Sequence, residues 1–328
     1  MIAVTGAEGE LGSLLLPMLT EQGYKVKAFR WKDGPKLKAC EEERVWDLCE
    51  KPTRYDGNNP LEGCICVIHL AAIPKPWEDW ETIYESNLLI DNALFAAAAN
   101  ASSLKRVVYA STNHTQHGAS MRTTCETIDS DSFGAHLLNG QPLMTPEDPP
   151  DPDSFYACSK LHGEYLGKLY ARIHGLEVVA LRIGWIVKEK NPFESRWVQS
   201  PDNQQYMRAM YLSHRDAKSI FTRAAVLPSM DLNIPQLGNG KFAVCYACSK
   251  NSRRVFDLSS TESVLKYQAQ DNAETWYCTL SPSLEACASI EVKKKHDGDE
   301  VQAVGDVETG GFEGCRSPGA SAQKRPKF

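Results

Sequence analysis

The sequence predicts an α/β protein, a doubly wound Rossmann fold with a parallel sheet and a small C-terminal substrate lobe. Short apolar runs alternate with helical patterns through the first half of the chain, and this alternation is typical of βαβ units. The run Cys64–Ile68 is apolar throughout, as expected of a parallel strand that is buried on both faces. A glycine-rich turn follows the first expected strand, where such folds bind a dinucleotide.

Residues 1–190 hold the expected strands and helices of the sheet, and we interpret them as an NAD(P)-binding Rossmann domain. Strands are expected at Ile2–Thr5, Lys25–Phe29, Arg44–Trp46, Cys64–Leu70, Arg106–Ser111 and Glu177–Ile183, and helices at Leu11–Gln22, Ile83–Ala99 and Ser154–His174. Residues 119–153 contain Gly, Pro, Ser and Asp without periodicity. We expect them to form a long loop over the site, because long loops in compact domains tend to be functional.

Beyond residue 190 the strict alternation fades. Residues 191–276 hold helical stretches at Gln204–Leu212 and Asp216–Val226 and a short apolar run at Phe242–Cys245. We interpret them as a substrate-side lobe packed on the Rossmann domain. Residues 277–328 include stretches without core residues, such as Lys293–Glu300 and Gly310–Phe328. We expect residues 277–328 to form a disordered tail, whose basic clusters are interpreted as solvated rather than as a nuclear or nucleic-acid signal.

The composition favours a small-molecule partner. The chain has 328 residues and a formal net charge of -6, which gives no general attraction to nucleic acid or to an anionic membrane. No run approaches the ~20 apolar residues of a membrane span, and the strand-like start Met1–Val4 leaves no room for a signal or transit peptide. We therefore expect a cytoplasmic protein.

The cysteines support the same interpretation. There are 11 of them, an odd number, and most lie inside apolar or helical stretches, as expected of free thiols in a cytosolic protein. Cys245 and Cys248 form one CxxC, but no second pair lies at the spacing of a zinc site. We interpret this pair as structural and expect no metal.

The turn after the first expected strand is the first candidate binding site. Gly6, Gly9 and Gly12 stand at the TGxxGxxG spacing between a strand and a helix. The first glycine allows a tight turn, the second lets the backbone approach a pyrophosphate, and the third permits close packing of helix on strand. The free N–H groups and the positive end of the helix dipole attract the anion. We expect Glu10 and Leu11, in the same turn, to contact the cofactor too.

The end of the second strand bears on the choice between NAD and NADP. NAD-binding versions of this fold carry an acid there, but the strand end here is Arg30, followed by Lys32 and Asp33. Arg30 and Lys32 fit a 2′-phosphate and favour NADP, whereas Asp33 reaching the ribose would favour NAD. After the third strand, Asp47 is a candidate adenine contact, together with Leu48, or alternatively a helix N-cap.

A tyrosine and a lysine form the candidate proton-transfer pair. Tyr156 and Lys160 are four residues apart in an expected helix, and this spacing puts them on one face. A free phenol with a pKa near 10 is too weak a base at neutral pH, and a nearby ammonium would lower that pKa. Thr112, at the end of a buried strand, is the expected donor to the substrate oxygen, with Ser111 as the alternative.

In combination, these motifs resemble the extended short-chain dehydrogenase/reductase family, which contains NAD-dependent epimerases and dehydratases. The resemblance covers about residues 1–276. The resemblance implies further cofactor contacts at three places. They lie directly after the fourth strand (Leu70, Ala71 and Ala72), on the following helix (Asn87) and at the end of the sixth strand (Ile183). Lys160 is also expected to hold the nicotinamide ribose.

Within the family the chain is most similar to uronate dehydrogenases and related sugar-phosphate dehydrogenases. The segments that carry this similarity are 111–114, 149–154, 182–185, 210–216 and 271–274. The resemblance implies that Asn113 and His114 contact the sugar, beside Thr112 and Tyr156, and that Arg208 binds its anionic group. His114 is alternatively a structural strand-end histidine. Arg30 departs from the acid of NAD users, and Pro74 stands where uronate dehydrogenases tend to carry a serine.

We therefore predict an NAD(P)-dependent oxidoreductase that oxidises the C1 hydroxyl of a sugar acid or sugar phosphate to a lactone by hydride transfer. Family habit suggests a homo-oligomer. The first alternative is a nucleotide-sugar epimerase or dehydratase, and the second is a non-catalytic NAD(P)-binding regulator. The tail and the low-apolar stretch 123–135 are also compatible with a damaged gene product.

Overall fold

The computed structural model describes residues 1–50, 58–118, 142–227 and 241–280. Its centre is a seven-stranded sheet in the order β3-β2-β1-β4-β5-β6-β7, in which every neighbouring pair is parallel. The strands are β1 (Ile2–Thr5), β2 (Val26–Arg30), β3 (Glu42–Val45), β4 (Cys66–His69), β5 (Arg106–Thr112), β6 (Glu177–Ile183) and β7 (Phe242–Ala247). The strand order reverses direction between β1 and β4, so the predicted doubly wound Rossmann fold is confirmed.

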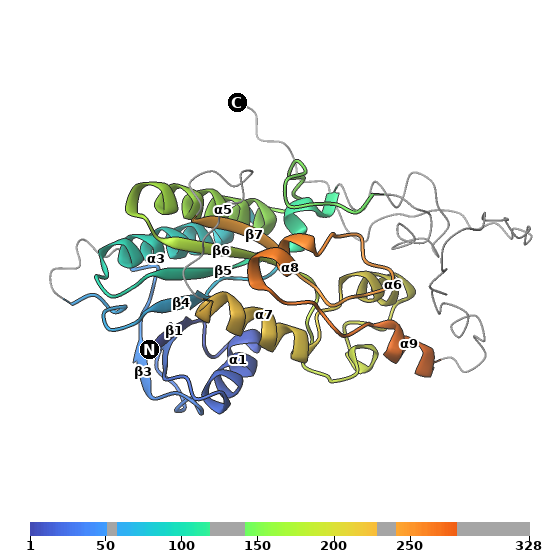
Figure 1. The fold of residues 1–328 in the computed structure, drawn as a ribbon, viewed down its shortest axis with the longest axis horizontal. Helices are drawn as coiled ribbons and strands as arrows, with labels where there is room; N and C mark the ends of the chain where they lie inside the picture. The colour runs from blue at the N-terminus through green and yellow to red at the C-terminus, as the bar shows by residue number, and fades with distance from the viewer. Residues whose placement is uncertain (51–57, 119–141, 228–240, 281–328) are drawn as a thin grey trace, which may run out of the picture. The chain divides into compact units, whose positions relative to one another are not determined.

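Helices cover both faces of the sheet (Figure 1). On one face lie α3 (Leu89–Asn100) and α5 (Phe155–His174), packed on a core that includes Phe95 and Tyr109. On the other lie α1 (Glu10–Glu21) and α7 (His214–Val226), whose core includes Leu15 and Phe221. Because both faces are covered, the central strands β1, β4 and β5 are buried at every position, as their apolar sequences predict.

Short polar side chains fix where several helices begin. Asp79 caps α2 (Trp80–Ile83), Ser154 caps α5 and Ser213 caps α7, each accepting a hydrogen bond from a backbone N–H of the first turn. Helix α5 ends at Gly175, which has a left-handed φ of 70° and so closes the helix without a side-chain penalty. These caps set the start of α5, and with it the position of Tyr156.

Several boundaries differ from those predicted. Strand β3 begins at Glu42, two residues before the expected start. The expected helix over Ile83–Ala99 is one continuous helical stretch of α2, the π-helix η1 (Tyr84–Leu88) and α3. The run Phe242–Cys245, interpreted as part of the lobe, lies in β7 and pairs with β6. The sheet therefore extends past the boundary drawn at residue 190.

Apart from a 3₁₀ turn that directly follows β5, the remaining elements lie beyond β6 in sequence. They are the 3₁₀ turn η4 (Pro192–Glu194) and helices α6 (Pro201–Met210), α8 (Ser259–Leu265) and α9 (Glu274–Leu280). A small apolar cluster joins η4, α6 and the start of α9 through Phe193 and Met207.

Residues 277–280, expected to open the tail, are helical in α9. The rest of the expected tail, and residues 119–141 of the expected loop, lie outside the described residues. Within the described part of the chain, no helix is long and apolar enough to cross a membrane.

Candidate active site

The glycine turn joins β1 to α1 by close backbone contacts. Gly6 has a φ of 63°, in the left-handed region, and a Cβ on it would lie 2.8 Å from the Ala71 nitrogen. A Cβ on Gly12 would overlap the Gly6 carbonyl oxygen and lie 2.7 Å from that of Ala7. Helix α1 starts at Gly9 without a side-chain cap, so its first N–H groups remain available to an anion. The turn therefore fits the diphosphate of a dinucleotide.

A buried hydrogen-bond chain holds the end of β4 against this turn. The Thr5 hydroxyl accepts from the backbone N–H groups of Leu70 and Ala71 at 3.2 and 3.3 Å, and it lies 2.7 Å from His69 Nδ1. On the other side of the ring, His69 Nε2 lies 3.2 Å from Asp91 Oδ1. Burial lowers the pKa of His69, so the ring is neutral, accepts at Nδ1 from Thr5 and donates at Nε2 to Asp91. The segment predicted to contact the cofactor is thus fixed beside Gly6.

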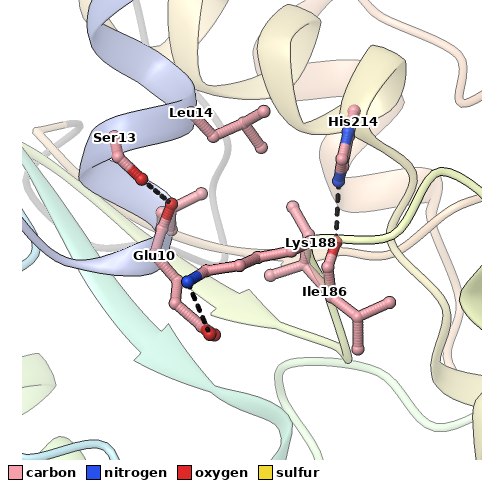
Figure 2. Close-up of a pocket in the computed structure, with 8 residues that line it drawn as sticks. Glu10, Ser13, Leu14, Ile186, Lys188 and His214 are labelled. Atoms are coloured by element: carbon pink, nitrogen blue, oxygen red, sulfur yellow. Dashed lines mark hydrogen bonds and ion pairs between the residues drawn. The ribbon is translucent and has the colours of Figure 1, made fainter. Parts of the chain in front are cut away.

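A pocket opens beside the first turn of α1 (Figure 2). Figure 2 shows Lys188, on the segment after β6, reaching toward Glu10, and the two charged groups lie 3.8 Å apart. His214 at the start of α7 also lines the pocket and makes a 2.7 Å hydrogen bond with the Val187 carbonyl. The lining residues are Glu10, Leu11, Ser13, Leu14, Ile186, Val187, Lys188 and His214. The sequence predicted Glu10 and Leu11 here, but not the cation Lys188.

Arg30 at the end of β2 is already engaged by carboxylates. Its guanidinium donates to Glu43 Oε1 and to the Pro35 carbonyl, both at 2.7 Å, and lies 3.7 Å from Glu8. Burial would raise the pKa of Glu43, but hydrogen bonds from Leu37 and Arg30 hold it below its ordinary value. A 2′-phosphate would therefore compete with two carboxylates for Arg30, and its role in cofactor choice stays a prediction.

The other residues expected near the adenosine part lie in short turns. Lys32 lies over the Trp31 ring, with its ammonium 4.3 Å from the centroid. Asp47 accepts a 2.9 Å hydrogen bond from the Cys49 N–H, and it caps a local turn rather than a helix. Leu48 is buried against Phe29 and Leu61 in the core. The adenine contact of Asp47 and Leu48 also stays a prediction.

Tyr156, Lys160 and Thr112 meet at the carboxyl ends of the strands. Tyr156 and Lys160 lie one turn apart on α5 and are buried, 8% and 2% exposed. Burial raises the pKa of the Tyr156 phenol, and hydrogen bonding to Thr112 opposes that rise. Lys160 Nζ lies 4.9 Å from the Tyr109 ring centroid and 6.0 Å from that of Tyr156, and burial lowers its pKa. The chain alone therefore does not lower the pKa of Tyr156, contrary to the expectation from the four-residue spacing.

Ser111 is committed to a second buried network, which leaves Thr112 as the hydroxyl near Tyr156. The Ser111 hydroxyl donates to Glu164 Oε1 at 2.5 Å, and Arg182 on β6 binds both oxygens of Glu164 at 2.9 and 2.8 Å. Arg182 also donates to the Gln116 side chain, which accepts from Tyr246 of β7. Glu164 was not predicted from the sequence, although its spacing of four residues from Lys160 and eight from Tyr156 marks the same helix face.

Asn87 lies in the π-helix η1 and is 1% exposed. Its amide accepts from the Ile73 N–H at 2.7 Å and donates to the Ser159 hydroxyl at 3.1 Å. It thus joins the segment after β4 to α5, beside Lys160. Single π-turns often mark functional sites, and the predicted cofactor-side role of Asn87 is compatible with this position. Ala72 and Ile183 lie beside the same strand ends and are partly exposed.

The predicted sugar-side residues lie in the 3₁₀ turn η2 (Asn113–Gln116), which continues directly from β5. Asn113 donates to the hydroxyl of Tyr206 on α6. The His114 ring meets that of Tyr156 edge to face, with centroids 6.2 Å apart. His114 Nδ1 lies 2.7 Å from Asp153 Oδ2, and His117 Nδ1 lies 2.6 Å from the same oxygen. Sequence analysis missed Tyr206, His117 and Asp153, since chain spacing alone does not bring them together.

Arg208 lies on α6 two residues after Tyr206, so the two side chains point to different faces of the helix. Its guanidinium binds both Glu274 oxygens, at 2.6 and 3.0 Å, and stacks 3.9 Å from the Tyr277 ring centroid. It is 5% exposed. The structure thus brings Arg208 to α9 rather than to Asn113 and His114, and its predicted role with an anionic substrate would require release from Glu274.

Comparisons with known proteins agree with this fold. Residues 2–197 match the model of the "NAD dependent epimerase/dehydratase family". An L-arabinose 1-dehydrogenase (NAD(P)(+)) of Haloferax volcanii is 31% identical, over 84% of this chain and 98% of that one. An NAD-dependent glucose-6-phosphate dehydrogenase of the same organism is 27% identical, over 87% and 98%. The crystal structure of a glucuronic acid dehydrogenase from Chromohalobacter salexigens superposes with a TM-score of 0.63 at 26% identity, covering 86% and 88%.

Proposed function

Because the chain belongs to the NAD-dependent epimerase/dehydratase family, we propose that it oxidises the C1 hydroxyl of a sugar acid or sugar phosphate to the lactone. The predicted family resemblance is confirmed, and the chain is an NAD(P)-dependent oxidoreductase. The single observation that carries the proposal is the meeting of Tyr156, Lys160 and Thr112 at the same carboxyl edge of the sheet as the glycine turn. A relative named as a 1-dehydrogenase of a sugar supports the choice of C1.

In this proposal the chain positions the sugar and removes one proton. Thr112 donates a hydrogen bond to the sugar oxygen, and the Tyr156 oxygen accepts the proton of the C1 hydroxyl. Lys160 supplies a positive charge on the same helix face, where it binds the ribose of the cofactor and stabilises the negative charge that develops on the Tyr156 oxygen during proton transfer. When bound, the oxidised nicotinamide accepts the hydride from C1. Burial of Tyr156 and Lys160 keeps bulk water from exchanging with the proton that is transferred.

Backbone groups supply more of the proposed cofactor contacts than side chains do. The uncapped N–H groups of α1 bind the diphosphate, with Gly6, Gly9 and Gly12 allowing its approach. The segment Leu70–Ala72, Asn87 and Ile183 lie along the remaining length of the dinucleotide. Arg30, Asp47 and Leu48 are proposed for its adenosine end, where Arg30 favours NADP. On the sugar side, Asn113 and His114 bind hydroxyl groups at one end of the substrate.

The assay that tests this function follows NAD(P)H formation by the purified protein with hexuronates, hexose phosphates and free aldoses. Oxidation should accumulate reduced cofactor and lactone in equal amounts. An epimerase or dehydratase would convert its sugar without net NAD(P)H, and a regulator would bind NAD(P) without turnover. Either of these outcomes would contradict the proposal.

Tyr156→Phe tests the proton acceptor. We expect kcat to fall about 10²–10⁴-fold, because the phenyl ring cannot accept a proton, with little change in the affinity for NAD(P)H. Tyr165→Phe is the matched control, since Tyr165 is on the same helix and exposed; it should keep wild-type kcat. Equal activity of Tyr156→Phe and the wild type would remove Tyr156 from the mechanism.

We propose further that residues 1–190 bind the dinucleotide and that residues 191–276 form the substrate side. Cytoplasmic location is supported by the cysteines that the structure describes, all of which are free thiols, as is usual in a reducing compartment. Assembly into a homo-oligomer stays a prediction from the family, and the elution volume of the purified chain tests it.

A further inference from the structure

Three metal-ligand side chains converge beside the proposed sugar site. His114, His117 and Asp153 each offer one ligand atom, and these atoms lie within 4.8 Å of one another. Both imidazoles direct Nδ1 to the same oxygen, Asp153 Oδ2, at 2.7 and 2.6 Å. From this convergence we propose that His114, His117 and Asp153 form a binding site for a divalent transition-metal cation of the Zn²⁺ type.

The backbone explains why the two imidazoles share a face. The turn η2 is a 3₁₀ helix, and its C-cap is His117. In 3₁₀ geometry the side chains at positions i and i+3 eclipse one another, which places the ring of His114 beside that of His117 with centroids 4.9 Å apart. The turn is anchored at its start, where Thr112 accepts a hydrogen bond from the His114 N–H at 3.3 Å. The pair is therefore set by local structure.

The third ligand comes from a distant part of the chain. Asp153 directly precedes Ser154, the N-cap of α5, and its second oxygen accepts from the Ser154 hydroxyl at 2.8 Å. Hydrogen bonds of this kind to the second oxygen orient ligating carboxylates. A further backbone hydrogen bond, from the Asp151 N–H to the Thr115 carbonyl at 2.8 Å, ties the segment before α5 to η2. The carboxylate is thus held against the two rings from both segments.

The donor types select the class of cation. Two imidazoles and one carboxylate suit Zn²⁺, Co²⁺ or Ni²⁺, whereas Mg²⁺ and Ca²⁺ prefer oxygen ligands.

Binding requires small movements of the side chains and a change of tautomer in each ring. Each imidazole carries its proton on Nδ1 when it donates to Asp153, and transfer of that proton to Nε2 frees Nδ1 as a ligand. With bonds of about 2.1 Å, tetrahedral ligand atoms are about 3.4 Å apart, so the nitrogen–oxygen separations must open by several tenths of an ångström. The three side chains are 16–23% exposed, which gives a cation access.

A Co²⁺ titration tests the site without reference to catalysis. One Co²⁺ should bind per chain, with the visible bands of nitrogen and oxygen ligands and no thiolate charge-transfer band, and Zn²⁺ should displace it. His117→Gln and Asp153→Asn should each weaken binding more than about tenfold, because each removes one of three ligands. His174→Gln is the matched control, since His174 is exposed at the end of α5; it should bind Co²⁺ like the wild type.

The proposal is wrong if the wild type binds no Co²⁺, if the spectrum shows thiolate ligation, or if both ligand variants bind as tightly as the control. Far-ultraviolet circular dichroism of each variant establishes that the fold is kept. A further consequence rests on the proposed function: His114 would serve both the cation and the sugar, so Zn²⁺ should raise the KM for sugar. The Co²⁺ spectrum does not depend on that function, and the two proposals can therefore fail separately.

Discussion

The glycine turn after β1 and the side chain of Arg208 were both predicted to bind an anion, and they differ in what determines their structure. Arg208 forms a cluster with Glu274 and Tyr277, called the Arg208 cluster below. In the turn, Gly12 lies against the carbonyl oxygens of Gly6 and Ala7, and Gly6 lies against the backbone of the segment after β4. At the Arg208 cluster, Glu274 reaches across 66 positions in sequence to bind the guanidinium. One anion site is made of backbone, and the other is already filled by a carboxylate of the chain itself.

This difference shows which kinds of function a local pattern predicts. A strand–turn–helix with three spaced glycines has few alternatives, since the spacing itself determines which N–H groups are exposed. A single arginine on a helix has many partners of opposite charge in a folded chain, and the strongest is a bidentate carboxylate. Motif spacing therefore predicts the backbone site reliably, whereas an isolated cation predicts only that some anion will be near it.

Among the changes that test this comparison, Gly12→Ala should have the largest effect, because the added Cβ would overlap the Gly6 carbonyl oxygen and lie 2.7 Å from that of Ala7. We expect the free energy of unfolding to fall by about 1–3 kcal/mol, and NADH affinity to fall at least about tenfold as the turn moves. Denaturant unfolding and NADH fluorescence titration measure the two effects. Glu21→Gln, exposed at the other end of α1, is the control and should change neither; wild-type NADH affinity in Gly12→Ala would show that the turn is not the cofactor site.

The same distinction explains how much of the structure the sequence predicted. The six expected strands of the sheet are present, because their apolar runs are continuous and separated by helical patterns. Strand β7 was assigned to the lobe, since a short apolar run does not reveal its partner, and only pairing with β6 places it in the sheet. Tyr156, Lys160 and Thr112 come together as expected.

The residues that sequence analysis missed share one property: each acts through a partner far along the chain. Asp153 reaches His114 across 39 positions, and Tyr206 reaches Asn113 across 93. Such pairs are fixed by tertiary packing and have no signature in spacing or periodicity. Glu164 is the exception, because its helix spacing from Lys160 was visible in the sequence.

Glu274→Gln examines the other side of the comparison, with a smaller expected effect. It removes the charge that balances Arg208 but keeps an oxygen acceptor, so we expect the free energy of unfolding to fall by about 1–2 kcal/mol. The ratio of kcat/KM for an acidic sugar to that for a neutral one should stay unchanged, since the contacts of Arg208 are with Gln205, Glu274 and Tyr277 rather than with Asn113 and His114. A clear rise in this ratio would instead assign Arg208 to the substrate's anionic group. Glu262→Gln is the control, a glutamate of α8 outside this cluster.

Arg30→Gln should give the smallest effect, because the Arg30 guanidinium is already bound by Glu43 at 2.7 Å. Arg30 shares a feature with each of the two anion sites: it stands at a strand end next to the glycine turn, and it is paired with a carboxylate of its own chain. Loss of the charge should lower kcat/KM for NADP relative to NAD by about fivefold to tenfold, equivalent to about 1.0–1.4 kcal/mol. Activity with NAD should change little. Arg44→Gln is the matched control, since Arg44 lies on β3, is half-exposed and pairs with Glu42. If both variants keep the wild-type ratio, Arg30 resembles Arg208 in being neutralised by its own chain, and the choice of cofactor must depend on residues other than the end of β2.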